Sequence, residues 1–144
     1  MEQALKALSH HLGDAYRANM DALEKALFCA PQAAWAQIAD GPIGPSGVVL
    51  FSPVFSTVRG GAGMYVSDLW VDSVERGNGL GPALLQNAAE TAADLWGACF
   101  MRLAVYPDNT RARALYNALG FEPVEAETTM VLTGQAFQNI RGQK

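Results

Sequence analysis

Three closely spaced glycines precede an apolar stretch in the segment VERGNGLGPALL, residues 74–85. Gly77, Gly79 and Gly81 have no side chains, and Arg76 gives the run the form R-x-x-G-x-G. Unobstructed amide groups at a helix start, with the positive end of the helix dipole behind them, form an anion site suited to a diphosphate. A tight strand-to-helix turn that needs positive φ angles explains the same glycines. The glycines alone leave both interpretations open.

Two other phosphate-binding motifs do not fit this segment. The dinucleotide fingerprint G-x-G-x-x-G needs its third glycine one residue later than Gly81, where Pro82 stands. A nucleotide P-loop needs Lys followed by Ser or Thr at the helix start, and the chain has Pro82 and Ala83 there. The R-x-x-G-x-G turn is the phosphate-binding pattern that remains.

A second group of candidate residues lies in YPDNTRARALYNALGF, residues 106–121. Asn109 stands at an expected strand end, and Tyr116 follows seven residues later, about two helical turns on, so both project to a similar side. The structural alternatives are a helix cap for Asn109 and a half-buried core aromatic for Tyr116.

A strand, a helix and a second strand are expected to position both groups. MYVSDLWV (residues 64–71) predicts the first strand, and PALLQNAAETAADLW (residues 82–96) predicts a helix with apolar residues at helical spacing. Pro82 suits the first helical position, and Gly97 suits the residue just past the end. CFMRLAV (residues 99–105) predicts a strand parallel to the first, because a helical crossover joins the two.

The N-terminal part is expected to form two helices and a hairpin. The helices lie between residues 2 and 28, and Pro31 ends the second. Residues 33–40 and 48–55 predict the two strands of the hairpin, with dense turn residues between them. Pro53 removes one donor from the strand ladder, which indicates a bulge or a pairing gap.

The C-terminal part is expected to form one short helix and two strands. The helix runs from Asp108 or Asn109 to Leu119 and is closed by Gly120. The segments FEPVEA (residues 121–126) and TTMVL (residues 128–132) predict the final strands. The tail after residue 134 carries no clear signal.

Composition limits the class of protein. With 144 residues, 50% of them hydrophobic and 17% charged, the chain predicts one soluble globular domain over residues 1–144. A net charge of −4 and a pI near 5.0 argue against nucleic-acid binding, which needs clustered Lys and Arg. Cys29 and Cys99 are expected to be buried in a reducing compartment. Neighbouring His10 and His11 point about 100° apart on a helix, which disfavours a shared metal ion.

Localisation is expected to be cytoplasmic. The N-terminal residues carry charges and two histidines where a signal peptide would need an uninterrupted apolar core. No apolar run elsewhere is long enough to cross a bilayer. We therefore expect no membrane partner.

Residues 48–132 resemble the GNAT superfamily of acetyl-CoA-dependent N-acetyltransferases. The match comprises the strand MYVSDLWV, the R-x-x-G-x-G turn with its long helix, and an N-x-x-A-x-x-L-Y-x-x-x-G-F segment. That segment is formed by Asn109, Ala112, Leu115, Tyr116, Gly120 and Phe121. The local pattern FSTVRGGAGMYVSDLWV is also similar to the diamine (spermidine/spermine) and thialysine acetyltransferase branch.

The resemblance implies an α/β (α+β) fold with a mixed, mostly antiparallel sheet, two splayed parallel strands and helices on both faces. It implies acetyl-CoA as co-substrate and no metal. Asn109, with Ala112 in the same motif, would bind the pantetheine arm, and Tyr116 would protonate the departing thiolate. The remaining carrier-binding residues would be the strand backbone at Leu69, Trp70 and Val71 and the diphosphate cradle of Arg76, Gly77, Asn78, Gly79, Leu80, Gly81 and Pro82.

The chain departs from the diamine branch at the expected base. That branch carries Glu-Asp in this strand, where the present chain has Ser67 followed by Asp68. A neutral hydroxyl is no base at neutral pH, so Asp68 or an ordered water would take the amine proton, or the substrate is not a polyamine. A hydrogen-bonded structural carboxylate is the alternative for Asp68.

A second departure is the start of the chain, where the family's first strand is missing from the expected elements. Residues 33–40 would then lie at a sheet edge that is open to pairing. We expect a homodimer or the C-terminal tail to cover that edge.

The leading hypothesis is an acetyl-CoA-dependent N-acetyltransferase that acts on a primary amine of a small molecule, a polyamine or an amino-acid-like compound, by direct attack in a ternary complex. A non-catalytic CoA-binding module and an acetyltransferase for protein N-termini or lysines are the alternatives.

Overall fold

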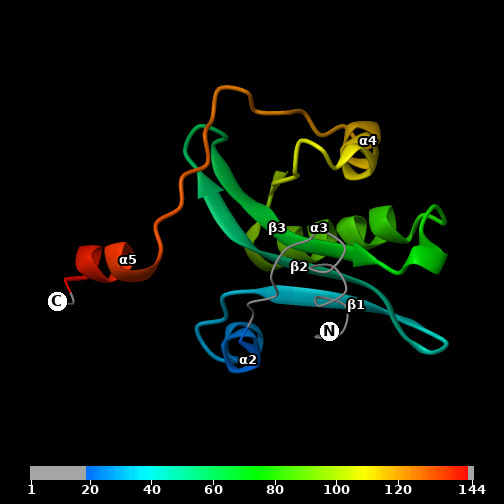
Figure 1. Ribbon diagram of the computed structural model, residues 1–144, viewed down its shortest axis with the longest axis horizontal. Helices are drawn as coiled ribbons and strands as arrows, with labels where there is room; N and C mark the ends of the chain where they lie inside the picture. The colour runs from blue at the N-terminus through cyan, green and yellow to red at the C-terminus, as the bar shows by residue number, and fades with distance from the viewer. Residues whose placement is uncertain (1–18, 143–144) are drawn as a thin grey trace. The chain divides into compact units, whose positions relative to one another are not determined.

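The computed structural model describes residues 19–142 (Figure 1). The first expected helix, His10 and His11 lie outside these residues. The chain divides into two compact units, Met1–Tyr106 and Pro107–Lys144, and each is described here by itself. The expectation of one domain over residues 1–144 stays a prediction.

A four-stranded mixed sheet forms the centre of the first unit. Its strands are β1 (Trp35–Gly41), β2 (Gly44–Ser56), β3 (Gly61–Val71) and β4 (Met101–Leu103), in the order β1-β2-β3-β4. The first three pair antiparallel, and β3 pairs with β4 in parallel. The expected fold class and the parallel crossover are thereby confirmed. β1 lies at an edge of the described sheet, and what covers that edge stays a prediction.

Helix α3 (Leu80–Trp96) connects β3 to β4 and packs against the sheet. Gly97 follows the helix in the left-handed conformation, at φ 69°, as expected. The helix begins two residues earlier than expected, because Gly79 is its N-cap and Leu80 is its first residue. Pro82 is therefore the third helical residue rather than the first. Its missing amide hydrogen costs no hydrogen bond there, since the first four amides of a helix have no intrahelical acceptor.

The core of the first unit joins α3 to the central strands. Figure 1 shows α3 running along β2 and β3, and α2 (Met20–Phe28) lying beside β1. Trp96, at the end of α3, donates a hydrogen bond of 3.0 Å from Nε1 to the carbonyl oxygen of Gly63, and its ring lies 4.8 Å from that of Trp35. This contact fixes the C-terminal end of the helix on the sheet. The buried side chains of the central strands and of α3 are Val48, Val49, Phe51, Met64, Val66, Leu84, Leu85, Ala88 and Ala92.

Helix α2 ends at Phe28, ahead of Pro31, as the sequence predicts. Cys29 and Cys99 are free but exposed, so the prediction that they are buried is wrong. Cys29 follows the last residue of α2, and Cys99 lies in the connection from α3 to β4. Neither lies on the inner face of a helix or strand, which is why their apolar neighbours do not bury them.

Of the two irregularities predicted at Pro53, the bulge lies at a different position, and a pairing gap is present on the β1 side only. The register of β2 and β3 shifts between Leu50 and Phe51, whereas Pro53 is paired with Met64 on β3. The pairing of β1 with β2 ends at Phe51, so no β1 residue lies opposite Pro53. The backbone N–H that proline lacks therefore leaves no β1 carbonyl without a donor.

The second unit contains two short helices, α4 (Thr110–Ala118) and α5 (Gly134–Ile140). The expected helix with its Gly120 end is confirmed, and Gly120 has φ 89°. The strands expected at residues 121–126 and 128–132 are wrong, because no strand forms there. Met130 and Val131 are 90% and 78% exposed, and a segment of high strand propensity forms no strand without a paired neighbour. Helix α5 lies in the tail that carried no sequence signal.

Candidate functional site

An irregularity in β3 coincides with the place where β4 leaves it. On β2, Leu50 faces Asp68 and the next residue, Phe51, faces Val66, so Ser67 is an extra residue, a β-bulge. The parallel register with β4 also ends at Val66, which pairs with Leu103. β3 continues to Val71 without β4 beside it. The two parallel strands therefore part at the bulge, as the splayed arrangement requires.

The backbone beyond the bulge has a defined direction. The amide of Asp72 donates to the carbonyl oxygen of Ser46 at 2.8 Å, so it faces β2. Because successive backbone groups of a strand point to opposite sides, those of Val71 and Leu69 face away from β2, towards the side that β4 has left. Those of Trp70 face β2, and its side chain is 9% exposed. Of the three predicted carrier-binding residues, Leu69 and Val71 are therefore the two whose backbone N–H and C=O groups face away from β2.

Asp68 follows the bulge directly and is half-buried. Burial raises the pKa of its carboxyl above the ordinary 3.8, and the neighbouring Ser67 opposes this to a smaller extent. The Ser67 hydroxyl donates to the carbonyl oxygen of Leu50 at 3.2 Å, so it serves the bulge and is no base. A carboxylate with a raised pKa holds a proton more tightly, which is the property of a better general base.

The glycine turn connects β3 to α3. Gly77 and Gly79 have φ angles of 88° and 83°, in the left-handed region that favours glycine. The turn geometry expected as the alternative explanation is therefore present. A Cβ atom at either position would meet no heavy atom within 4 Å, so the space beside both glycines is open.

The start of α3 also leaves backbone donors without acceptors. Gly79 provides no side-chain cap, and its carbonyl accepts from the amide of Ala83 at 3.1 Å. The amides of Gly77, Gly79, Leu80 and Gly81 donate to no other residue within the range 19–142. Several free donors at the positive end of a helix of 17 residues suit an anion such as a diphosphate.

Arg76 does not simply extend into solvent beside this turn. Its Nε donates to the carbonyl oxygen of Val71 at 2.8 Å, and the bond is partly buried. The resemblance implied only that Arg76 belongs to the diphosphate cradle. The structure adds a fixed contact to the end of β3.

The second unit carries the other candidate residues on α4. Asn109 is the N-cap, and its Oδ1 accepts from the amide of Ala112 at 3.1 Å, so the helix-cap alternative is what the structure shows for that oxygen. Tyr116 is half-buried, and its ring lies 5.5 Å from that of Phe121. Burial raises the pKa of the Tyr116 phenol above the ordinary 10.0, which keeps it protonated and able to donate.

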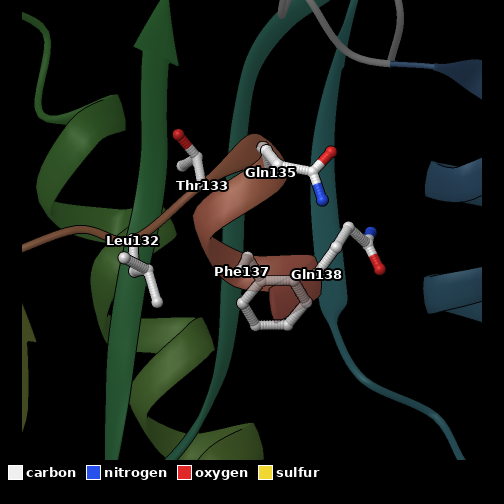
Figure 2. Close-up of a pocket in the computed structure, with 6 residues that line it drawn as sticks. Leu132, Thr133, Gln135, Phe137 and Gln138 are labelled. Carbon is white, nitrogen blue, oxygen red and sulfur yellow. The ribbon is translucent and has the colours of Figure 1, made fainter. Parts of the chain in front are cut away.

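A hollow of about 580 Å³ also lies in the second unit, around the start of α5 (Figure 2). None of its lining side chains ionises at physiological pH, so it offers no acid or base. The lining residues are Leu132, Thr133, Gly134, Gln135, Phe137 and Gln138.

The predicted site residues thus fall into two groups. The first unit brings Asp68, the outward backbone of β3 and the turn at residues 76–82 into one continuous stretch of chain. The second unit holds Asn109, Ala112 and Tyr116 on α4. Sequence reasoning missed the bulge at Ser67 and the bond of Arg76. The polar pair Ser67 and Asp68 inside an apolar strand was the one available signal for the bulge.

Residues 19–142 contain neither a cluster of metal ligands nor a helix that could span a membrane. Within that range, His, Cys, Asp and Glu side chains form no group of three that could hold a metal ion. The helices of the same range are all too short or too polar to span a membrane. The expected cytoplasmic location stays a prediction.

Comparison with known proteins identifies the class of fold and then the family. A solved integron cassette protein from the mobile metagenome of V. cholerae superposes with a TM-score of 0.73 over 97% of this chain and 88% of its own, at 19% identity, which shows the shared fold alone. The chain belongs to the acetyltransferase (GNAT) family, whose model matches residues 6–121.

Two sequence relatives support the suspected branch of the family. The chain is 36% identical to thialysine N-epsilon-acetyltransferase of Bos taurus over 71% of its length, and 32% identical to that of Sus scrofa over 75%. The matched region spans 62% of the bovine protein and 67% of the porcine one. The chain therefore spans less than two thirds of the bovine relative.

Proposed function

We propose that this protein is an acetyl-CoA-dependent N-acetyltransferase that acetylates a primary amine of a small molecule by direct attack in a ternary complex. The observation that carries the proposal is the combination of the bulge at Ser67, where β3 and β4 part, with the open amides of Gly77 and of residues 79–81. Membership of the acetyltransferase (GNAT) family supports the same reaction.

The two ends of the co-substrate fit two features of the first unit. Free amides ahead of α3 would hold the diphosphate, and the open space beside Gly77 and Gly79 leaves room for it. The outward N–H and C=O groups of Leu69 would pair with the pantetheine arm as a neighbouring strand would. On α4, the Oδ1 of Asn109 is used by the cap, so its amide nitrogen would be the group that contacts this arm.

The acceptor must lose a proton before it can attack. A primary alkyl amine has an ordinary pKa of about 10.4, so it is charged at neutral pH. Asp68 or a water that it orients would take that proton, and burial prepares Asp68 by raising the pKa of its carboxyl. The nitrogen lone pair then forms a bond to the thioester carbon. Fixed main-chain donors at the bulge would stabilise the oxyanion, an effect worth roughly 3 kcal/mol per donor.

Collapse of the tetrahedral intermediate breaks the carbon–sulfur bond and leaves a thiolate. Tyr116 would donate its phenolic proton to this sulfur, because its raised pKa keeps the donor neutral until the thiolate forms. As the amide forms, its nitrogen loses a second proton, which returns to the phenolate left on Tyr116 directly or through water. The net change is then the release of one proton, the one taken at Asp68. The products are an N-acetyl amine and free CoA.

The acceptor is proposed to be a small amine of the lysine or polyamine type. Two relatives are named thialysine N-epsilon-acetyltransferases, and that name describes an amine at the end of an amino-acid side chain. Asp68 offers a half-buried negative charge for a cationic amine of that kind.

The test is release of thiol from acetyl-CoA across a panel of amines, with wild type beside Tyr116→Phe. The panel contains thialysine, lysine, spermidine and a peptide with a free N-terminus. We expect turnover with a small amine and a loss of about 100-fold in kcat for Tyr116→Phe, the scale of removing a general acid. Binding of CoA without turnover on any amine would favour a non-catalytic CoA-binding module. Preference for the peptide would favour the protein-acetylating alternative.

A further inference from the structure

Arg76 makes a side-chain contact that its expected role does not require. It follows the short helix η1 (Ser73–Glu75), five residues after Val71, the last residue of β3. Its Nε donates to the Val71 carbonyl at 2.8 Å in a partly buried position. One edge of the guanidinium is therefore committed to β3, and direct contact with a diphosphate is left to its terminal nitrogens.

The accepting carbonyl lies where β3 has lost a neighbour. Val71 faces Gly47 of β2, but its carbonyl points to the other side, because the amide of Asp72 is bonded to Ser46 of β2. On that side β4 has already ended at Leu103, opposite Val66. Arg76 thus supplies the donor that a neighbouring strand would supply. A hydrogen bond from a charged donor is roughly twice as strong as a neutral one.

We propose that Arg76 is a positioning residue that fixes the free end of β3 against the glycine turn. The segment between the bulge at Ser67 and the bond at Val71 is then held at both ends, with the outward groups of Leu69 between them. This sets the spacing between the backbone that would hold the thioester arm and the amides that would hold the diphosphate. The inference rests on the proposed function, since it assigns Arg76 a role within that site.

An acetyl donor that lacks the diphosphate distinguishes a positioning role of Arg76 from a direct contact between its charge and the diphosphate. We would titrate acetyl-CoA and S-acetyl-pantetheine into wild type, Arg76→Ala, Arg76→Lys and Arg76→Gln, following binding by NMR. We expect Arg76→Ala to weaken both ligands by a similar factor, about tenfold, the scale of one charge-assisted hydrogen bond. Arg76→Gln, which keeps a neutral N–H donor, should recover part of the binding of both ligands. If only acetyl-CoA is weakened, or if Arg76→Lys alone restores binding, the charge acts on the diphosphate and the proposal is wrong.

Hydrogen exchange in the free protein tests the same contact without any ligand. Loss of the Arg76 bond should speed exchange at the amides of Asp72 and Val74, which lie between the two partners. The amide of Met64, bonded to Phe100 at 2.9 Å at the paired end of β3, should be unchanged. Arg141→Ala removes an equal charge from the residue that follows α5 and serves as the control. Unchanged exchange at Asp72 and Val74 would overturn the proposal.

These readouts also separate the two hypotheses. If wild type binds neither ligand and releases no thiol, the proposed function fails. The exchange rates at Asp72 and Val74 then still decide whether Arg76 fixes the end of β3.

Discussion

The starts of α3 and α4 both carry motif residues, but they are completed in different ways. Asn109 closes α4 with its own side chain, through a bond of 3.1 Å from the amide of Ala112. Gly79 begins α3 without a side chain, and its own amide and those of Gly77, Leu80 and Gly81 have no acceptor among the described residues. Glycine in place of a capping side chain costs a helix only about a few tenths of a kcal/mol, so the two starts differ mainly in which amides stay open rather than in stability. The start of α4 is thus closed within the chain, whereas the start of α3 keeps the open amides that the proposed anion site requires.

Substitution of Gly79 is the strongest way to break this contrast. Gly79→Ala places a Cβ on a residue with φ 83°, which costs about 1–2 kcal/mol, and relief of that strain would turn the free amides away. We expect the free energy of unfolding to fall by that amount and the affinity for CoA to fall more than tenfold. Urea unfolding and calorimetric titration would measure the two effects.

Gly97 provides a matched control at the other end of the same helix. It also has a left-handed φ, 69°, and open space around its missing Cβ. Gly97→Ala should cost similar stability and leave CoA affinity unchanged. Equal CoA affinity in the two variants would show that the start of α3 is not the anion site.

Asn109 offers a second, smaller test, because two parts of its amide have separate roles. Asn109→Ala removes the cap and should lower the free energy of unfolding by about 1 kcal/mol. Asn109→Asp keeps an oxygen for Ala112 but removes the NH₂ group, so it should retain stability and lose about tenfold in CoA affinity, the scale of one hydrogen bond.

Asn19, which caps α2 through the amide of Asp21 at 3.0 Å, serves as the comparison for that experiment. Asn19→Ala should cost stability alone. Full CoA affinity in Asn109→Asp would leave the residue with its capping role only.

Asp68 is expected to give the smallest effect on stability. Burial raises the pKa of its carboxyl, so the folded protein takes up this proton at a higher pH than the unfolded chain does. Above the folded-state pKa, the charged carboxylate therefore lowers the free energy of unfolding. This loss disappears as the pH falls towards 3.8, the ordinary pKa of the carboxyl in the unfolded chain. Asp68→Asn should melt slightly above wild type at neutral pH, and the gap should close on acidification, while acetyl transfer is lost.

The exposed carboxylate Asp94, on α3, is the control for that scan. Asp94→Asn should leave both the melting temperature and the rate of acetyl transfer close to wild type. An Asp68→Asn variant that melts below wild type at neutral pH would show a stabilising, structural carboxylate instead.

The sequence was informative where local signals are complete within one element. Helix α3 was predicted from its apolar spacing and from Gly97, and the parallel pairing of β3 with β4 followed from the handed crossover through that helix. The alternative of a helix cap at Asn109 was also readable, because an N-cap needs only its own helix.

The features that sequence reasoning missed depend on partners elsewhere in the chain. An extra residue such as Ser67 becomes a bulge only in relation to the register of β2, which alternation along β3 cannot show. The segment 121–133 has strand-like residues, but pairing decides whether a strand forms. Arg76 reaches Val71 only because η1 folds the chain back on itself.

The exposure of both cysteines affects how the reaction can be followed. Cys29 and Cys99 lie on the surface, and the chain contains two cysteines in all. Any reagent that counts sulfhydryls to monitor CoA released in the proposed reaction will also react with the protein, up to two equivalents per chain. The same accessibility gives two attachment points for spectroscopic labels, one just after α2 and one just before β4.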